Sequence, residues 1–257
     1  MKIDVCLLQE THVKDIDIEY WSKEWGGSIY CFSGTEHSQG EMILLNKNFK
    51  CENVQQIICE NRIVGISFLH KDEVYNCFSI YCPNRHTDKI NFYQSLSDKI
   101  VQCTEENAHL IIGGDFNCVY DLEKDNIVGN PHKRSEISSF HTAITNMNVQ
   151  DVWRTQHPNV KEFTFRRKNQ PISRRLDYIF LGNETVNIAQ SSDIIDMPLS
   201  DHRGVLVHLS TEKIKYGPNY WKMNDSLLKD DLYVSQVNEI IENTINENRN
   251  ILNVCTI

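Results

Sequence analysis

The 257-residue sequence lacks the features of a membrane-spanning or disulfide-stabilised protein. No window holds the roughly 18 apolar residues that a transmembrane helix needs, and no segment is typical of a signal peptide. It contains no CxxC pair, and its nine cysteines are an odd number of scattered residues, which does not suit a disulfide framework or a zinc site. There is no internal repeat and no low-complexity tract. We therefore expect an intracellular protein with reduced, mostly buried thiols.

Positive charge is also scarce, because 26 Lys and Arg face 35 Asp and Glu, for a net charge of −9. This balance argues against non-specific adhesion to nucleic acid over the whole surface. A local basic patch exists nevertheless in the stretch FRRKNQPISRR, which has no acidic residue between its cationic ones: Arg166, Arg167, Lys168, Arg174 and Arg175. The stretch is either a solvated hairpin tip or a place where a phosphate is held.

Apolar alternation predicts that strands dominate the first two-thirds of the chain. NRIVGISFLHKDEVYNCFSIY is typical of a hairpin that turns at 70–73, and two helices are indicated by apolar spacing at 90–100 and 137–147, the second with Ser135 as N-cap. This mixture favours an α/β (α+β) domain with antiparallel sheets. The strands are expected at 3–8, 29–32, 42–45, 63–68, 74–80, 110–112, 176–181 and 205–209.

The character of the chain changes near residue 211, where a Gly-Pro break is followed by Trp221 and an amphipathic stretch. We expect one domain over 1–210, and a linker with an amphipathic helix over 211–257.

Polar clusters follow several of the expected strands. LQETH carries Glu10, IYCPN carries Tyr81 and Asn84, GGDFN carries Asp115 and Asn117, RRLDYIF carries Asp177, and SDHRG carries Asp201 and His202. Each cluster alone has an ordinary explanation, as a turn, a solvated strand end or a hydrogen-bonded core histidine.

Together the clusters supply the groups needed for metal-assisted hydrolysis of a phosphate ester. Glu10 can hold a hard divalent cation, and Asp115 can accept a proton from a water nucleophile. Asn117 and Tyr81 can donate hydrogen bonds to phosphate oxygens. His202, held by Asp177 or Asp201, can donate to the phosphate or assist the leaving oxygen.

These five motifs, in this order, resemble the endonuclease/exonuclease/phosphatase superfamily, which includes AP endonucleases and DNase I, over about residues 3–210. The resemblance implies a four-layered αββα sandwich of two mostly antiparallel sheets, with the site at one edge. It also implies Mg²⁺ or Mn²⁺ as cofactor, and metal binding by Glu10 and Asp201. The implied catalytic residues are Tyr81, Asp115, Asn117, Asp177 and His202.

LQETH, SRRLDYIF and GPNYWKMNDSLL further resemble the endonuclease module of non-LTR (LINE-type) retrotransposon polyproteins. This implies a DNA substrate that is nicked to leave a 3′-hydroxyl, action in the nucleus, and a module that is monomeric as a domain and joined to a reverse transcriptase. The residues that would contact nucleic acid are Asn84, Thr164, Arg166, Arg167, Lys168, Arg174, Arg175 and Ser200.

One departure from the family pattern concerns the start of the domain. Only nine residues precede Glu10, so the family's first strand and helix have no counterpart, and the neighbours of that central strand are expected to expose unpaired backbone groups. Two alternatives to a nicking endonuclease therefore stay open. One is a phosphatase or phosphodiesterase of the same superfamily, and the other is a catalytically inactive fragment of an element.

Overall fold

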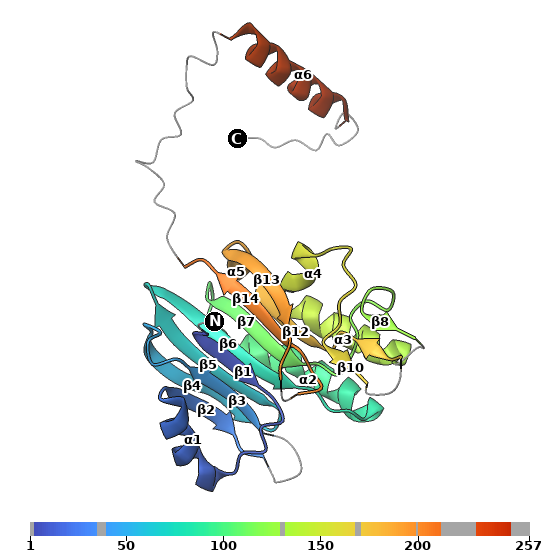
Figure 1. Cartoon of the computed structure of the whole chain (residues 1–257). Helices are drawn as coiled ribbons and strands as arrows, with labels where there is room; N and C mark the ends of the chain where they lie inside the picture. Colours follow the sequence, from blue (N-terminus) through green and yellow to red (C-terminus); the bar gives the residue numbers. More distant parts are fainter. Residues whose placement is uncertain are drawn as a thin grey trace. The chain divides into compact units, whose positions relative to one another are not determined.

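The computed structural model describes residues 3–34, 40–128, 132–167, 171–198, 200–211 and 230–247. The chain divides into two compact units, Met1–Thr211 and Glu212–Ile257 (Figure 1). In the second unit the structure describes one helix, α6 (Asp231–Glu247), where the sequence predicts an amphipathic helix. No helix in the described ranges is both long and apolar enough to cross a membrane.

A six-stranded sheet forms the centre of the first unit. Its neighbouring strands are antiparallel except for β6 and β7, which run parallel and are joined through helix α2 (His86–Cys103). The predicted hairpin is confirmed, because β5 and β6 pair in register from Ile63↔Ile80 to His70↔Glu73. In sheet order the strands are β4 (Glu52–Glu60), β5 (Ile63–His70), β6 (Glu73–Tyr81), β7 (His109–Asp115), β12 (Asp177–Gly182) and β9 (Val149–Asp151).

One face of this sheet is covered by α2 and by α3 (Arg134–Asn146), as Figure 1 shows. The apolar side chains spaced along each helix, such as Tyr93 and Phe140, pack with Phe78 and Ile112 of the sheet into a fully buried core. The predicted helix positions are thus confirmed. The predicted cap is wrong, because Lys133 is the N-cap of α3 and Ser135 lies inside the helix.

The other face carries a second layer of strands. β1 (Val5–Leu8), β3 (Glu41–Leu45) and β2 (Ser28–Phe32) form a three-stranded sheet, and β13 (Ala189–Ile195) pairs with β14 (Gly204–Leu209). Between the layers, Ile43 packs with Val64, Ile66 and Cys77 in a second core. Because residues 63 and 64 alternate between the two cores, the sheet is apolar on both faces. The predicted α/β sandwich is confirmed.

The second layer is divided. β1 pairs with β3 and β14 pairs with β13, and no described ladder joins β1 to β14. β1 and β14 therefore each have one edge without a described strand partner. Unpaired backbone was expected at this central position of the layer. The remaining elements of the unit are η1 (Asp15–Asp17), α1 (Ile18–Trp25), α4 (Val152–Gln156), α5 (Asn183–Val186), and the short strands β8 (Asn126–Ile127), β10 (Phe165–Arg166) and β11 (Ser173–Arg174).

Candidate active site

Three of the predicted site residues form a row across the central sheet. Tyr81 ends β6, Asp115 ends β7 and Asp177 begins β12. The strand register pairs Tyr81 with Asp115, and Asp115 with Asp177. Directly paired residues on neighbouring strands lie side by side. These side chains, which are distant in sequence, therefore meet at one end of the three strands. Gly114 permits the close pairing, because a Cβ there would lie 2.0 Å from the carbonyl oxygen of Ile80.

His202 joins this row from the loop that precedes β14. Its Nδ1 lies 2.8 Å from Oδ2 of Asp177, so Asp177 and not Asp201 holds the imidazole. Ligand atoms of Asp115, Asp177 and His202 all lie within 4.8 Å of one another. Burial alone would lower the pKa of His202, but the hydrogen bond with Asp177 and the charges of Asp177 and Asp115 raise the pKa to about 9. The imidazole is therefore protonated at neutral pH, and Nε2 is left to donate to another group.

The surroundings of Asp115 disfavour its ionised form. Burial and the negative charge of Asp177 raise the pKa of Asp115 to about 8, against the opposing effects of His202 and of the Asn117 N–H. That N–H donates to Oδ1 of Asp115 at 2.8 Å. The second oxygen, Oδ2, is the one available to accept a proton from water.

Asn117 lies in a loop whose backbone is tightly held. It has a φ of 48°, in the left-handed region, which Asn tolerates better than most residues. Its side-chain Nδ2 donates to the carbonyl oxygen of Cys82 at 2.8 Å, and its own carbonyl oxygen accepts from Nζ of Lys89 at 2.6 Å. The carboxamide therefore has one committed N–H and keeps its second N–H and its oxygen for another partner.

Buried polar residues of α2 and α3 support this loop, and the sequence analysis missed them. Lys89 is 5% exposed, and Nζ lies 3.9 Å from Oε2 of Glu136. Glu136 is also within hydrogen-bond distance of His86, at 2.7 Å, and His132, at 3.0 Å. The spacing Lys89–Tyr93–Leu96 places the lysine on the apolar face of α2, and this was the signal that could have identified it.

Glu10 reaches the site from the end of β1. The hydroxyl of Tyr81 donates to Oε1 of Glu10, and Tyr81 is 5% exposed whereas Glu10 is exposed. The guanidinium of Arg62 lies 4.9 Å from the centroid of the Tyr81 ring and helps to hold that ring. The hydroxyl of Tyr81, predicted to donate to a phosphate, therefore donates in this structure to Glu10, the residue predicted to bind a metal.

The donor set fits a hard divalent cation. Asp115 and Asp177 bring carboxylate oxygens within 4.8 Å of each other, and Glu10 adds a carboxylate beside Tyr81. Carboxylate oxygens are the ligands that Mg²⁺ and Mn²⁺ prefer. The pKa of Asp115 is raised first by burial, which removes water from the carboxylate, and then by repulsion from the negative charge of Asp177. A cation bound there would relieve this repulsion.

The predicted small hydroxyls have different surroundings. Thr164 is fully buried, and its Oγ1 accepts the backbone N–H groups of Leu176 and Asp177 at 3.0 and 3.1 Å. It therefore positions Asp177 and is closed to a nucleic acid, so its predicted phosphate contact is wrong. Ser200 is exposed, and its Oγ accepts the backbone N–H of His202 at 3.0 Å. Asn84 and Asp201 are exposed.

The basic stretch divides into an exposed and a buried part. Arg166 and Arg167 are exposed, Arg174 is half-buried, and Lys168 lies outside the described residues. Arg175 is 1% exposed, so its predicted contact with a DNA backbone is wrong. The sequence pattern misled because the chain turns inward at Arg175, between β11 and β12.

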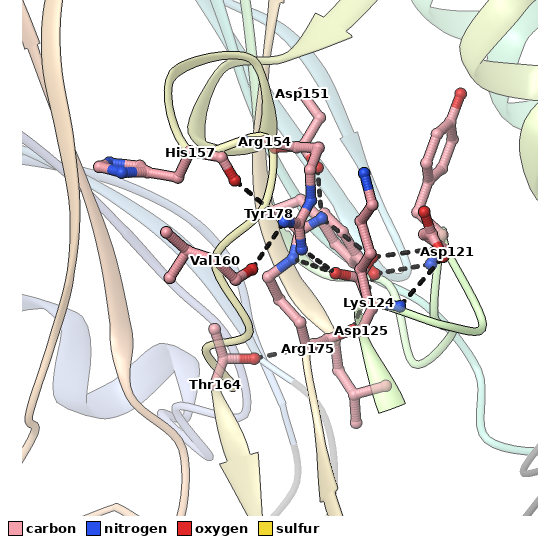
Figure 2. A network of polar contacts seen from close by, with 12 residues as sticks. Asp121, Lys124, Asp125, Asp151, Arg154, His157, Val160, Thr164, Arg175 and Tyr178 are labelled. Atoms are coloured by element: carbon pink, nitrogen blue, oxygen red, sulfur yellow. Dashed lines mark hydrogen bonds and ion pairs between the residues drawn. The ribbon is translucent and has the colours of Figure 1, made fainter. Parts of the chain in front are cut away.

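Figure 2 shows what holds Arg175. Its Nε and Nη2 donate to the two carboxylate oxygens of Asp125, each at 2.9 Å, and Nη2 lies 2.6 Å from Oδ2 of Asp151. Arg154 donates to Asp125 at 2.6 Å, and the hydroxyl of Tyr178 donates to the carbonyl oxygen of Arg175 at 2.7 Å. The sequence analysis missed this network, which we call the Arg175 network (Asp125, Asp151, Arg154, Arg175).

Comparison with known proteins adds a family match and a transposon relative. A profile described as "Endonuclease/Exonuclease/phosphatase family" matches residues 2–202. The chain is 30% identical over 239 residues to the "Transposon TX1 uncharacterized 149 kDa protein" of Xenopus laevis, covering 91% of this chain and 18% of that protein. The chain thus spans less than a fifth of the length of this relative.

Solved structures show the same fold at low sequence identity. An AP endonuclease from Archaeoglobus fulgidus superposes with a TM-score of 0.63 at 16% identity, covering 80% of this chain and 88% of that one. An AP endonuclease from Leishmania major gives 0.64 at 15% identity, covering 79% and 77%. The 3′ phosphatase NExo from Neisseria, bound to a product DNA hairpin, gives 0.65 at 14% identity, covering 80% and 89%.

Proposed function

Because the chain belongs to the endonuclease/exonuclease/phosphatase family, we propose that it hydrolyses phosphodiester bonds of DNA, cutting one strand with the help of a divalent cation. The observation that carries this proposal is the convergence of Tyr81, Asp115, Asp177 and His202 at one sheet edge. The choice of DNA is supported by the similarity to a transposon protein. The cut would leave a 3′-hydroxyl and a 5′-phosphate.

Asp115 acts as the general base. Oδ1 is occupied by the N–H of Asn117, so Oδ2 accepts the proton as the water oxygen forms its bond to phosphorus. Because the pKa of Asp115 is raised to about 8, its ionised carboxylate is a stronger base than a solvated aspartate, and a cation bound beside it would favour that ionised form.

His202 acts as a hydrogen-bond donor to the phosphate. As an imidazolium held through Nδ1 by Asp177, it presents Nε2–H to the phosphate, where charge builds as the bond to the leaving 3′ oxygen breaks. Asp177 fixes the orientation of the ring and stabilises its positive charge, as a buried carboxylate beside a catalytic histidine does in other enzymes.

The remaining groups hold the phosphate and the cation. The free N–H of the Asn117 carboxamide donates to a phosphate oxygen. Glu10, which accepts a hydrogen bond from Tyr81, and Asp201 would hold Mg²⁺ or Mn²⁺. When bound, the cation polarises the phosphate and offsets the charge that develops on its oxygens. The exposed Arg166 and Arg167 contact the DNA backbone outside this centre.

We further propose that residues 1–211 are one module of a longer polyprotein that carries a reverse transcriptase and acts in the nucleus, with 212–257 linking the two. The support is the length of the transposon relative, of which the chain covers 18%.

The test is conversion of supercoiled plasmid to the open-circle form by the purified chain. With Mg²⁺ we expect nicking, and with EDTA none. Asp115→Ala and His202→Ala should each lower the rate about 10²- to 10⁴-fold, the usual contribution of a general acid or base. Asp193→Ala and His208→Ala, which change the same residue types at exposed positions of β13 and β14, are the matched controls and should leave the rate unchanged.

The same preparation separates the alternatives. Release of inorganic phosphate from a 3′-phosphorylated oligonucleotide without nicking would identify a phosphatase. Absence of both activities in a protein with a cooperative unfolding transition would identify an inactive fragment. Nicking that survives both substitutions would contradict the roles given to Asp115 and His202.

A further inference from the structure

A second group of metal-binding side chains lies outside the candidate active site. Cys118 is in the loop after β7, His132 lies two residues before α3, and Glu136 is in the first turn of α3. A ligand atom of each lies within 4.8 Å of those of the other two, and all three residues are buried. Among the described residues such a group occurs in one other place, the row at the candidate active site. We call the new group the Cys118 cluster (Cys118, His132, Glu136).

The hydrogen bonds of the described residues do not satisfy the Cys118 cluster. Nδ1 of His132 lies 3.0 Å from Oε2 of Glu136, whereas Nε2 is enclosed and has no hydrogen-bond partner in the described part of the chain. The thiol of Cys118 makes a long contact of 3.6 Å with the carbonyl oxygen of Val119. A buried polar atom without a partner is costly, so a network held by hydrogen bonds alone does not account for this arrangement.

The chemistry of the three side chains selects the kind of metal. Zn²⁺ is bound in proteins by Cys sulfur, His nitrogen and Asp or Glu oxygen, whereas Mg²⁺ takes oxygen ligands. Ligand atoms around a tetrahedral zinc ion lie about 3.3–3.6 Å from one another, so a metal would draw the most distant atoms of the Cys118 cluster together by about 1 Å. Side-chain rotation can supply a movement of this size.

We propose that the Cys118 cluster binds Zn²⁺ through Sγ of Cys118, a ring nitrogen of His132 and a carboxylate oxygen of Glu136, with water in the fourth position. On binding, Zn²⁺ replaces the thiol proton of Cys118, which is released to solvent. His86 lies 2.7 Å from Oε1 of Glu136 and orients the carboxylate, as hydrogen-bonded partners of metal ligands do. The sequence analysis argued against a zinc site because the cysteines are scattered, but this site needs a single thiol.

The charge of Lys89 acts on this site in two directions. Nζ lies 3.9 Å from Oε2 of Glu136 and donates to the carbonyl oxygen of Asn117, so it repels a cation. Burial raises the pKa of the Cys118 thiol to about 12, and Lys89 opposes this rise by favouring the thiolate. Burial and Lys89 also lower the pKa of His132 to about 4, which keeps the ring neutral, as a ligand must be. Two anionic ligands against one ammonium leave a negative charge for the cation to offset.

The expected role of the zinc ion is structural. Cys118 directly follows Asn117, and the loop that carries both begins at Asp115, the end of β7. A metal shared with His132 and Glu136 would tie this loop to α3. The Cys118 cluster is buried and therefore closed to DNA, so the metal holds the loop and takes no part in hydrolysis. The proposal does not rest on the proposed nicking activity.

The experiment uses Co²⁺ and then Zn²⁺ as probes of the full chain, with excess Mg²⁺ to occupy the oxygen ligands of the candidate active site. Co²⁺ bound by a thiolate gives a charge-transfer absorption band in the near ultraviolet. We expect this band in the unmodified chain and its loss when Zn²⁺ displaces Co²⁺. Amide hydrogen exchange in the loop from Asp115 to Cys118 should slow when Zn²⁺ is added.

Protein variants assign the band to its ligands. Cys118→Ser should remove it, and Cys118→Ser and His132→Gln should each weaken Zn²⁺ binding about 100-fold or more. His86→Gln should weaken binding about 10- to 100-fold and keep the band, because it removes a partner and not a ligand. Cys77→Ser, which changes a buried thiol of β6, is the matched control, and Asp177→Asn tests the row at the candidate active site. Neither should change the band or the affinity.

All variants are first checked for a cooperative unfolding transition. If the ligand variants do not fold, X-ray absorption of the zinc-loaded unmodified chain decides. A sulfur atom among the zinc ligands would support the proposal, and a shell of nitrogen and oxygen alone would overturn it.

Absence of the band in the unmodified chain would overturn the proposal, as would a band that survives Cys118→Ser. Loss of the band in Cys77→Ser would also overturn it, because another thiol would then hold the metal. Failure of the nicking assay, with or without zinc, would leave the binding result intact.

Discussion

Two clusters of charged side chains meet at neighbouring positions of the chain and differ in how their negative charge is balanced. Arg175 and Asp177 are two residues apart, yet Arg175 belongs to the Arg175 network and Asp177 to the row with Asp115 and His202. In the first, two carboxylates meet two guanidiniums within a buried set of hydrogen bonds. In the second, the pKa of Asp115 is raised to about 8, because burial and Asp177 oppose its ionisation.

The difference separates a stabilising cluster from a chemical one. Buried charges that are fully paired have little chemical reactivity, and removing one partner of such an ion pair is strongly destabilising. Charges that are held together without full compensation are typical of sites that bind a cation or transfer a proton.

Asp177→Asn should lower the nicking rate about 10²- to 10⁴-fold, because the amide cannot stabilise the imidazolium of His202 or fix its tautomer. The pKa of His202 should also fall, because Asp177 raises it, so the alkaline limb of the pH–rate profile should move to lower pH. Plasmid nicking against pH and NMR titration of the imidazole measure the two effects. Asp193→Asn is the control, and an unchanged His202 titration in Asp177→Asn would contradict the pairing.

Arg175→Met should lower the free energy of unfolding by about 3–5 kcal/mol, because it leaves Asp125 and Asp151 buried without a counter-charge. Urea unfolding measures this loss. Arg167→Met, an exposed position of the same basic stretch, should change it by less than about 0.5 kcal/mol. Similar effects of the two substitutions would mean that the Arg175 network is not closed to solvent.

Asp115→Asn should raise the free energy of unfolding by about 1–2 kcal/mol at pH 8 while it removes nicking. A raised folded-state pKa means that ionisation destabilises the fold, so the contribution of Asp115 is lost as pH rises from its ordinary pKa near 3.8 to about 8. The gain in the variant should therefore grow over this pH range and be absent at pH 3. Thermal unfolding at several pH values, without divalent cations, checks it. A variant that is less stable at pH 8 would show that Asp115 is already well compensated.

Arg166→Ala and Arg167→Ala should have the smallest effects. Each should reduce the slope of log affinity against log salt for a DNA duplex by about one, with the base preference unchanged. Anisotropy titrations at several salt concentrations measure the slope. Arg174→Ala, at a half-buried position, tests where the exposed part of the stretch ends.

The sequence predicts the buried parts of this molecule better than its edges. Strands such as β5 and β6 have apolar residues at the spacing of a strand, and both were predicted from the sequence. β4 and β13 were missed because exposed polar residues, such as Gln55 and Ser191, interrupt the alternation. α1 was also missed, since no residue in it is buried.

The site follows the same rule. Glu10, Asp115 and His202 were identifiable because each lies in a short motif at a strand end. Asp125, Asp151 and Arg175 are scattered over 50 residues and carry no local pattern, so their pairing exists only in the folded chain. Thr164 is similar, because nothing beside it in sequence indicates that it holds the backbone of Asp177.

The parallel pairing of β6 with β7 has a consequence for how the protein folds. In the described part of the central sheet it is the one parallel ladder, and all of α2 lies between its strands. Such a crossover loses chain entropy before its contacts form, which slows folding. Tyr81 and Asp115 therefore meet only after α2 has docked, and refolding should recover hairpin structure before nicking activity.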